Sequence, residues 1–280
     1  MFAPMDKYCV LGNPVEHSRS PWIHARFAEL TGEDIAYERR LIPLDGFAEA
    51  VRAFRAEGGK GCNITVPFKF QAARIATGFA GRAALAQAAN VLVFEGERIL
   101  ADNTDGVGLV KDIEDNARVP LAGREVLLAG AGGAVSGVLG PLIAAKPARI
   151  VVCNRTPDKA QALVDRHRDL ARAQGVEVTA CGLDEVRGAY DVVVNGTAAS
   201  MAGAGVPVPP SVLKPGTLAV DMMYGEAARG FMQWASSHGA QPRDGLGMLV
   251  EQAAEAFLVW RGVRPPTARV LDELRATLAR

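Results

Sequence analysis

The sequence has few of the features that mark secreted, membrane-bound or nucleic-acid-binding proteins. Only four of its 280 residues are cysteines, and they are widely separated with no Cys-x-x-Cys pair, which favours buried, reduced thiols over a disulfide framework. The 31 basic residues balance 31 acidic ones and no basic run occurs, so we expect neither nucleic acid nor an anionic membrane as a partner. No apolar run reaches the roughly 18 residues of a membrane span, and no charged and then apolar leader opens the sequence. These absences predict a cytoplasmic protein.

The sequence does contain a long alternation of short apolar runs with helical segments. The chain is long enough for two domains, and its composition, 49% hydrophobic and 22% charged, is ordinary for a globular protein. In the second half we predict strands at 126–129, 148–153, 176–180, 190–194, 218–222 and 240–243, and helices at 135–145, 158–173 and 231–237. Strands that alternate with helices predict a parallel sheet with helices on both faces.

The first half also combines strands and helices. We predict strands at 8–11, 36–41 and from 61 to Pro67, a hairpin of 90–94 and 98–101 around Glu95-Gly96, and helices at 22–30, 47–56, 77–88 and 107–115. A last helix, 248–260, has apolar residues at helical spacing. The fold class is therefore predicted as α/β with two domains.

A glycine-rich turn follows the apolar run 126–129. It consists of Gly130, Ala131, Gly132, Gly133 and Ala134. Glycine lets the backbone turn sharply and approach a ligand closely, and the helix that follows offers free N–H groups to a pyrophosphate. The spacing is a variant of the dinucleotide-binding fingerprint, although a glycine turn without a ligand is the alternative.

The end of the next strand indicates which dinucleotide is bound. An NAD site places an acidic residue there, whereas an NADP site places a basic one near the 2′-phosphate. The sequence has Asn154, Arg155 and Thr156 with no Asp or Glu, and Lys159 follows within reach on the next helix. Arg155 can bind phosphate through two nitrogens, so we predict NADP, with ordinary solvated charges as the alternative.

Two serines flank Arg19 before the first helix of the first half. Ser20 precedes Pro21 and is predicted to be an N-cap with proline at N1, which needs no ligand. Ser18 is not needed for that cap, so the two hydroxyls could instead hold a carboxylate, and the spacing does not decide between these interpretations. We interpret His17 and His24 as structural because neither has neighbours in a metal or triad pattern.

Further polar residues of the first half follow predicted strands or open helices. Asn63 and Thr65 would face the same way on a strand, and Lys69 follows just after, where parallel sheets place ligands, although a solvated lysine is the alternative. Asp105 precedes a helix and could simply cap it. Gln252 lies beside the apolar face of the last helix, as a boundary residue or as a ligand contact.

Taken together and in order, these motifs resemble the shikimate dehydrogenase family along the whole chain. The matching segments are 17–21 (HSRSP), 63–69 (NITVPFK), 88–90 (AAN), 102–106 (DNTDG), 130–138, 154–156 (NRT) and 244–252 (DGLGMLVEQ). The resemblance implies an NADP-dependent oxidoreductase that interconverts 3-dehydroshikimate and shikimate in the chorismate pathway of aromatic amino-acid biosynthesis. It also implies a substrate domain of residues 1–105 completed by 245–280, and a Rossmann-like dinucleotide domain of residues 106–244, with the active site in the cleft between them.

The resemblance also implies a role for each matching residue. Lys69 and Asp105 would be the catalytic pair, with Asp105 also on a ring hydroxyl. Ser18 and Ser20 would hold the substrate carboxylate, with a further contact from Tyr224, and Asn63, Thr65, Asn90 and Gln252 would bind ring hydroxyls. The cofactor would contact Gly130, Ala131, Gly132, Gly133, Ala134, Asn154, Arg155, Thr156, Lys159 and Gly245, and no metal is expected.

The sequence departs from the family pattern at several positions. Ala25, Phe70, the segment 195–201 (NGTAASM) and the segment 225–230 (GEAARG) differ from the usual residues. These departures leave room for a paralogue that acts on quinate or an aminated analogue, or that prefers NAD. A non-catalytic NADP-binding sensor and a sugar-phosphate or amino-acid dehydrogenase also stay open, because fold alone does not separate them. The partner is expected to be a small-molecule substrate, with the protein a monomer or a homodimer.

Overall fold

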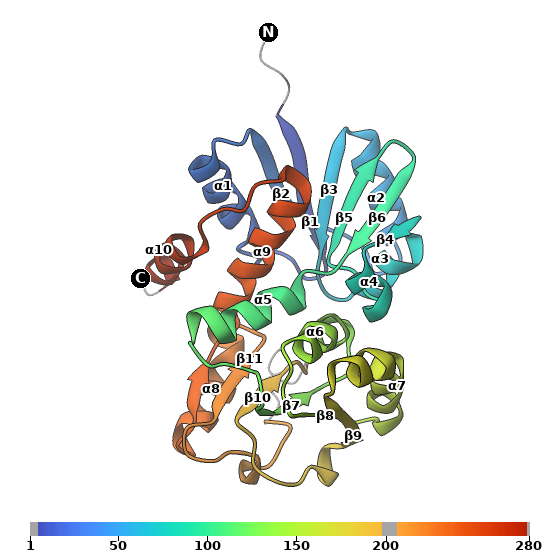
Figure 1. Cartoon of the computed structure of the whole chain (residues 1–280). Coiled ribbons are helices and arrows are strands. Elements are labelled where there is room, and N and C mark those ends of the chain that lie inside the picture. The colour runs from blue at the N-terminus through green and yellow to red at the C-terminus, as the bar shows by residue number, and fades with distance from the viewer. Residues whose placement is uncertain (1–4, 198–205, 279–280) are drawn as a thin grey trace. The chain divides into compact units, whose positions relative to one another are not determined.

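The computed structural model describes residues 5–197 and 206–278 (Figure 1). The chain divides into two compact units, residues 1–108 with 250–280 (unit 1) and residues 109–249 (unit 2). The chain passes from one unit to the other within two helices, α5 (Asp105–Lys111) and α9 (Leu246–Arg261). We predicted the domain limits at 105 and 245, a few residues before these passages. Each unit contains its own six-stranded sheet, so the predicted fold class, α/β with two domains, is confirmed.

Unit 1 is built on a mixed sheet with the strand order β2-β1-β3-β5-β6-β4 (Figure 1). Its strands are β1 (Asp6–Gly12), β2 (Ile35–Leu41), β3 (Gly59–Ile64), β4 (Gly78–Phe79), β5 (Val91–Glu95) and β6 (Arg98–Asp102). Strand β1 pairs in parallel with β2 and β3, whereas β5 is antiparallel to β3 and forms the predicted hairpin with β6. The carboxyl end of β3 therefore lies beside the start of β5.

Helices cover both faces of this sheet because its central strands are apolar on both sides. On one face, Cys9, Leu11 and Cys62 pack against buried residues of α2 (Phe47–Ala56), α3 (Lys69–Ile75) and α4 (Gly81–Ala86). On the other face, Tyr8 of β1 stacks on Trp260 of α9, and α1 (Ser20–Thr31) contributes His24 and Phe27 to the same aromatic group. Helix α10 (Thr267–Leu278) contacts α1.

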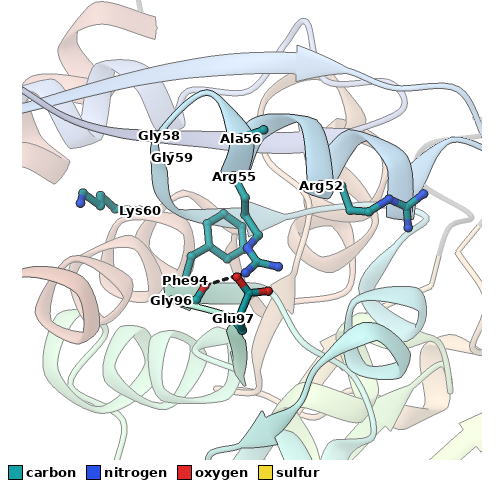
Figure 2. Close-up of a pocket in the computed structure, with 9 residues that line it drawn as sticks. All are labelled: Arg52, Arg55, Ala56, Gly58, Gly59, Lys60, Phe94, Gly96 and Glu97. Atoms are coloured by element: carbon teal, nitrogen blue, oxygen red, sulfur yellow. Dashed lines mark hydrogen bonds between the residues drawn. The ribbon is translucent and has the colours of Figure 1, made fainter.

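A hollow of about 470 Å³ opens at the start of β3 (Figure 2). Arg52, Arg55, Lys60, Phe94 and Glu97 are among its lining residues. Arg55 is held across it by a hydrogen bond of 2.6 Å from its guanidinium to the carbonyl oxygen of Gly96. None of the predicted site residues lines this hollow, since Asn63 and Lys69 lie toward and beyond the other end of β3.

Unit 2 contains an all-parallel sheet with the strand order β12-β11-β10-β7-β8-β9. Its strands are β7 (Glu125–Ala129), β8 (Arg149–Asn154), β9 (Glu177–Gly182), β10 (Val192–Asn195), β11 (Leu218–Asp221) and β12 (Gln241–Arg243). The order runs outward from β7 to β9 on one side and from β10 to β12 on the other, which is the doubly wound arrangement. Ligands of such sheets bind at the carboxyl ends of the strands where the order reverses, here β7 and β10.

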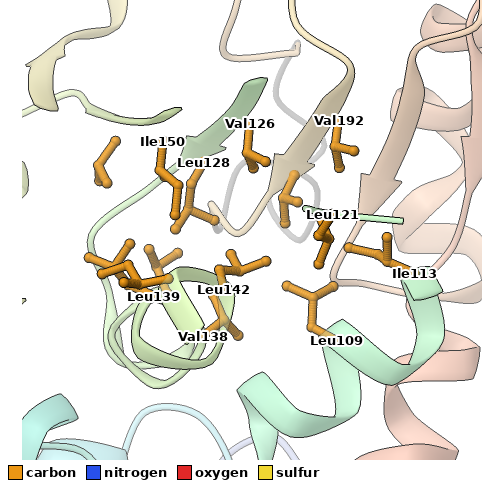
Figure 3. Packing of buried hydrophobic residues seen from close by; sticks show 14 of the residues in the cluster. Leu109, Ile113, Leu121, Val126, Leu128, Val138, Leu139, Leu142, Ile150 and Val192 are labelled. Carbon is orange, nitrogen blue, oxygen red and sulfur yellow. The ribbon is translucent and has the colours of Figure 1, made fainter. Parts of the chain in front are cut away.

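The helices of unit 2 complete two separate cores. Helices α6 (Gly133–Ala144) and α7 (Pro157–Gln174) pack with Leu109 and Ile113 against one face of the sheet, where Val126, Leu128 and Ile150 are fully buried (Figure 3). Helix α8 (Arg229–Ser237) and short 3₁₀ turns cover the opposite face. Fully buried strands of this kind carry few polar residues, which explains why they appear as continuous apolar runs in the sequence.

The structure differs from the predictions at three places in the first half. The predicted helix over 77–88 is confirmed only over α4, Gly81–Ala86, because β4 occupies Gly78–Phe79 and the backbone N–H groups of Thr77 and Ala80 bond to carbonyl oxygens of the β6 strand. The predictions also missed α3, which begins directly after Pro67 and Phe68. The predicted helix 107–115 begins earlier, at Asp105, and continues as a π-helical turn over Asp112–Asn116. In the second half, the predicted departure at 198–201 lies outside the described residues.

Candidate active site

Lys69 and Asp105 are paired in unit 1. Lys69 is the first residue of α3 and Asp105 the first residue of α5. The ammonium of Lys69 donates a hydrogen bond to Oδ2 of Asp105 at 2.5 Å, and the two side chains are only 13% and 5% exposed. Lys69 is therefore not a solvated surface charge. Asp105 is itself the first helical residue of α5, and its two carboxylate oxygens accept hydrogen bonds from Lys69 and Asn90.

Asn90 connects this pair to a helix far along the chain. Its Nδ2 lies within 2.9 Å of Oδ1 of Asp105 and 3.0 Å of Oε1 of Gln252, and its Oδ1 accepts the backbone N–H of Thr104 at 2.8 Å. Thr104 also approaches Gln252 through its hydroxyl, at 3.4 Å. The hydrogen bonds of one amide thus fix the turn at 102–105, the start of β5 and helix α9 relative to one another.

Asn63 lies beside this group at the carboxyl end of β3. It is 6% exposed, and its Nδ2 donates to the carbonyl oxygen of Asn90 at 3.1 Å. Its Oδ1 accepts a hydrogen bond of 2.7 Å from the hydroxyl of Tyr37 on β2. Thr65, just past the strand, is partly exposed, and its backbone N–H bonds to the carbonyl oxygen of Leu11.

Ser20 is not the N-cap of α1, which corrects our interpretation of this residue. Arg19 occupies the N-cap position, Ser20 is the first helical residue, and the helix has no side-chain cap. Instead, the hydroxyl of Ser18 lies 3.2 Å from that of Ser20 and 3.3 Å from the Ser20 backbone N–H. The two hydroxyls are thus adjacent to each other and to the N-terminus of a helix, an arrangement that suits a carboxylate.

A network of ion pairs supports the segments that carry these side chains. Arg82 of α4 binds Asp102 through two nitrogens at 2.6 and 2.7 Å and reaches Glu255 of α9 at 2.9 Å. Arg264 binds the other oxygen of Glu255 at 2.6 Å. Burial alone would raise the pKa of Glu255, but Arg82 and Arg264 hold that pKa below its ordinary value. The network therefore fixes β6, which leads into the 102–105 turn, to the helix that carries Gln252.

In unit 2, the glycine turn has the backbone shape that the fingerprint requires. Gly130 has φ +115°, and a Cβ there would lie 3.0 Å from the side chain of Val135 and 3.1 Å from the carbonyl oxygen of Gly196. Ala131 follows it, Gly132 is the N-cap of α6, and Gly133 and Ala134 open the helix. Because α6 begins just after the carboxyl end of β7, its first N–H groups lie at that edge of the sheet, and no side chain caps the helix.

The residues predicted to contact a 2′-phosphate follow the neighbouring strand β8. Asn154 ends that strand, and its Nδ2 donates to the carbonyl oxygen of Thr156, which is the N-cap of α7. Arg155, Thr156 and Lys159 are all exposed. The turn therefore presents two cationic side chains to solvent near the glycine turn, since β7 and β8 are adjacent.

Tyr224 and Gly245 follow other strands of the same sheet. Tyr224 is partly exposed and lies three residues after β11. Gly245 follows β12, and a Cβ there would lie 2.4 Å from the carbonyl oxygen of Met222, so glycine is required for packing alone. Asp112, which is fully buried, binds Arg243 through both carboxylate oxygens and so fixes the segment that leads into α9.

The structure explains one departure from the family pattern. Gly196 lies in the segment 195–201 noted above, and a Cβ there would lie 2.4 Å from Cγ2 of Val135 and 2.9 Å from Sδ of Met222. Glycine at this position is therefore required by the valine on α6.

Sequence reasoning missed several residues of the site. Tyr37 was included only in a predicted strand, and Asn103 and Thr104 were noted only as part of a turn. A polar side chain within a predicted strand or turn suggests that the residue takes part in a hydrogen bond. It does not show which residue is the partner. Arg82 gave no signal, because a single arginine in a helix is typical of an exposed surface, and Asp102 was noted only as part of the 102–106 motif.

The fold and these groups define the class of the protein: a two-unit α/β protein with a dinucleotide-type sheet and a lysine paired with a buried aspartate. Within residues 5–197 and 206–278, no helix is both long and apolar enough to cross a lipid bilayer. The same ranges contain no group of three or more His, Cys, Asp or Glu side chains that could hold a metal ion.

Comparison with known proteins specifies the family. Family models described as shikimate dehydrogenase substrate binding domain, shikimate / quinate 5-dehydrogenase and shikimate 5′-dehydrogenase C-terminal domain match residues 10–92, 112–203 and 245–275. The chain is 64% identical over 279 residues to a shikimate dehydrogenase (NADP(+)) of Acidovorax sp. strain JS42, covering 100% of this chain and 99% of that one. A relative of the same name from Dechloromonas aromatica is 53% identical, with 98% of each chain covered. The chain belongs to the shikimate dehydrogenase family.

Solved structures agree with this assignment. An Ael1 enzyme from Pseudomonas putida is 45% identical with a TM-score of 0.86, covering 96% of this chain and 98% of that one. The shikimate 5-dehydrogenase of Thermus thermophilus, solved in complex with NADP(H) and shikimate, is 28% identical with a TM-score of 0.81, covering 97% of this chain and 99% of that one. The fold of both units is therefore that of the family.

Proposed function

We propose that this chain is an NADP-dependent shikimate dehydrogenase, which reversibly reduces 3-dehydroshikimate to shikimate in the chorismate route to aromatic amino acids. The observation that carries the proposal is the buried contact between Lys69 and Asp105 within a set of hydrogen-bonded amides. The name shared by relatives at 53 to 64% identity supports the choice of substrate and cofactor.

The chemistry explains why a lysine and a carboxylate are needed together. Reduction of a ketone to an alcohol requires a hydride at the carbon and a proton at the oxygen. The bound nicotinamide cofactor supplies or accepts the hydride. Lys69 donates the proton to the ketone oxygen during reduction and removes it from the hydroxyl during oxidation. Asp105 orients the amine of Lys69 and matches its positive charge, which burial alone would disfavour.

The remaining polar residues of unit 1 are assigned to the substrate. We assign the substrate carboxylate to Ser18 and Ser20, whose hydroxyls are adjacent and lie at the start of α1. The ring hydroxyls are assigned to Asn63, Thr65, Asn90, Gln252 and Asp105, and a further carboxylate contact to Tyr224. Because the amide of Asn90 is already bonded to three other residues, its contact with a hydroxyl would be shared with those bonds.

The residues of unit 2 fit NADP. The positive φ of Gly130 and the uncapped start of α6 provide a close backbone approach and free N–H groups for the pyrophosphate. Exposed Arg155 and Lys159 provide positive charge for the 2′-phosphate, with Asn154 and Thr156 beside them. The other assigned contacts are Ala131, Gly132, Gly133, Ala134 and Gly245. The substrate is thus assigned to the domain predicted as 1–105 with 245–280, and the dinucleotide to 106–244.

A panel of substrates and cofactors tests this function. Purified protein is mixed with shikimate, quinate or aminoshikimate and with NADP⁺ or NAD⁺, and absorbance of the reduced nicotinamide is followed. We expect the highest kcat/KM with shikimate and NADP⁺. A preference for quinate or for NAD⁺ would identify a paralogue, and no turnover with any pair, despite NADP⁺ binding, would indicate a non-catalytic sensor.

The setting in the cell is part of the proposal. We propose a cytoplasmic enzyme that is a monomer or a homodimer. Support comes from the thiols of Cys9, Cys62 and Cys153, which are free and buried, as expected in a reducing compartment. Light scattering coupled to gel filtration would decide between the two oligomeric states.

A further inference from the structure

The side-chain amide of Asn63 is held at both ends by other residues of unit 1. Its Nδ2 lies 3.1 Å from the carbonyl oxygen of Asn90, and its Oδ1 lies 2.7 Å from the hydroxyl of Tyr37. A backbone carbonyl can only accept, so the nitrogen of the amide must face Asn90 and the oxygen must face Tyr37. The phenol of Tyr37 therefore has to be the donor in this pair.

The Tyr37 hydroxyl stays protonated, as a hydrogen-bond donor must. Desolvation raises the pKa of Tyr37 well above its ordinary value, although the side chain of Ser20 partly offsets the rise. The hydroxyl consequently keeps its proton throughout the range in which an enzyme of this kind works, and Tyr37 remains a hydrogen-bond donor to Asn63.

The ring of Tyr37 is fixed by its aromatic neighbours. It stacks on the ring of His24 with centroids 4.2 Å apart and planes 6° from parallel, and Trp260 lies 6.3 Å away on another side. Burial lowers the pKa of His24 to about 3, so the stacked ring is neutral. A ring held in this way cannot swing its hydroxyl away from Asn63 without disturbing a packed aromatic group.

We propose that Tyr37 is a positioning residue for the substrate: its hydroxyl sets the orientation of the Asn63 amide, and Asn63 in turn binds a ring hydroxyl. The inference rests on the proposed function, because it needs Asn63 to contact shikimate. It assigns a role to a strand residue for which the sequence motifs provide none.

A double-mutant cycle tests this route with a matched control. The variants are Tyr37→Phe, Asn63→Ala, the two combined, and Tyr8→Phe as control. Tyr8 is the register partner of Tyr37 on β1, and its hydroxyl meets Arg261 rather than Asn63. For each variant, the KM for shikimate, the KM for NADP⁺ and kcat are measured, together with the midpoint of thermal unfolding.

The expected result is specific to one kinetic constant. Loss of one hydrogen bond in Tyr37→Phe should raise the KM for shikimate about fivefold, with kcat and the KM for NADP⁺ within about twofold of wild type. In the Asn63→Ala background the same substitution should change the KM for shikimate less than about twofold, and Tyr8→Phe should leave it unchanged.

Several outcomes would overturn the proposal. Equal effects of Tyr37→Phe with and without Asn63 would show that the hydroxyl acts by another route, such as Ser20. An unchanged KM in Tyr37→Phe, or loss of its fold, would show that the hydroxyl has no role or only a structural one. Absence of shikimate oxidation by the wild-type protein would instead refute the proposed function itself.

Discussion

The two units prepare their candidate sites by different means. In unit 1, the side chains contact one another directly: Lys69 binds Asp105, Asn90 reaches both Asp105 and Gln252, and Tyr37 holds Asn63. In unit 2, the backbone sets the shape of the glycine turn, and the charged side chains of Arg155 and Lys159 extend into solvent.

This difference has a consequence for function. A group held by other side chains before its ligand arrives loses little freedom on binding, so its removal should affect chemistry or substrate affinity strongly. An exposed charge on a flexible stem is screened by water, so its removal should have a smaller effect that is confined to one ligand.

The largest effect should follow from Lys69→Met. Removing the group that transfers the proton should lower kcat about 10²- to 10⁴-fold, while the KM for NADP⁺ changes little. Lys60→Met, which removes an exposed lysine of the same unit, is the control and should leave kcat unchanged. If the Lys69 variant turns over within a few-fold of wild type, Lys69 and Asp105 are not the catalytic pair.

The backbone shape of unit 2 can be tested at Gly196. The Cβ of alanine would lie 2.4 Å from Val135, so Gly196→Ala should destabilise the protein by about 1–3 kcal/mol. Adding Val135→Ala should recover much of that loss, and the loss should appear as a lower midpoint in denaturant or heat. Gly230→Ala is the control, since nothing lies within 4 Å of a Cβ there. If the single variant is as stable as the control, the turn is not as tightly packed as the structure indicates.

A pH dependence should follow from the buried histidine of unit 1. The pKa of His24 is about 3 in the folded protein against an ordinary 6.5, because burial disfavours the charged ring. Between these values the unfolded chain binds a proton that the folded chain does not, so stability falls as the pH drops from 6.5 toward 3. At pH 5 this proton uptake lowers the free energy of unfolding by about 2 kcal/mol relative to its value well above pH 6.5.

His24→Phe isolates this contribution. The variant should be less sensitive to acid than wild type, as measured by urea unfolding at about pH 8 and about pH 5. At the higher pH the ring is neutral in both states, so a difference there reports packing alone. Identical acid sensitivity in the two proteins would mean that the His24 ring takes up a proton without unfolding.

The smallest effect should follow from Arg155→Ala in unit 2. Loss of one exposed cation at the 2′-phosphate should raise the KM for NADP⁺ about tenfold and leave the KM for NAD⁺ unchanged. Arg168→Ala, on the exposed part of α7, is the control. Equal changes for both cofactors would place Arg155 away from the 2′-phosphate.

The sequence predicted unit 2 more accurately than unit 1. Four of its six parallel strands, β7, β8, β10 and β11, are apolar runs that are almost fully buried, and the glycine turn follows from local backbone preferences. In unit 1 the alanine-rich segment 77–88 was predicted as one helix, but only Gly81–Ala86 is helical, because the backbone of Thr77 and Ala80 pairs with β6. Tertiary pairing of this kind overrides local helix preference.

The sequence predicted the roles of some single polar residues but not the contacts of others. The motif order led to the family and to Lys69, Asp105 and Gln252, yet nothing in the sequence connects Tyr37 to Asn63 or indicates that Asn90 joins three segments. Ser20 was given a local explanation as a helix cap, and the structure places its hydroxyl beside that of Ser18 instead.

Four features could be predicted without coordinates: the alternation of strands and helices in unit 2, the glycine turn, the absence of an acidic residue after β8, and the family. These features depend on backbone preferences and spacings within a few tens of residues. Only the tertiary structure decided which side chains meet, such as Asn90 and Gln252, which are 162 residues apart. A hydrogen bond depends on the final distance and direction between two groups, and for residues so far apart both are set by the packing of the whole unit.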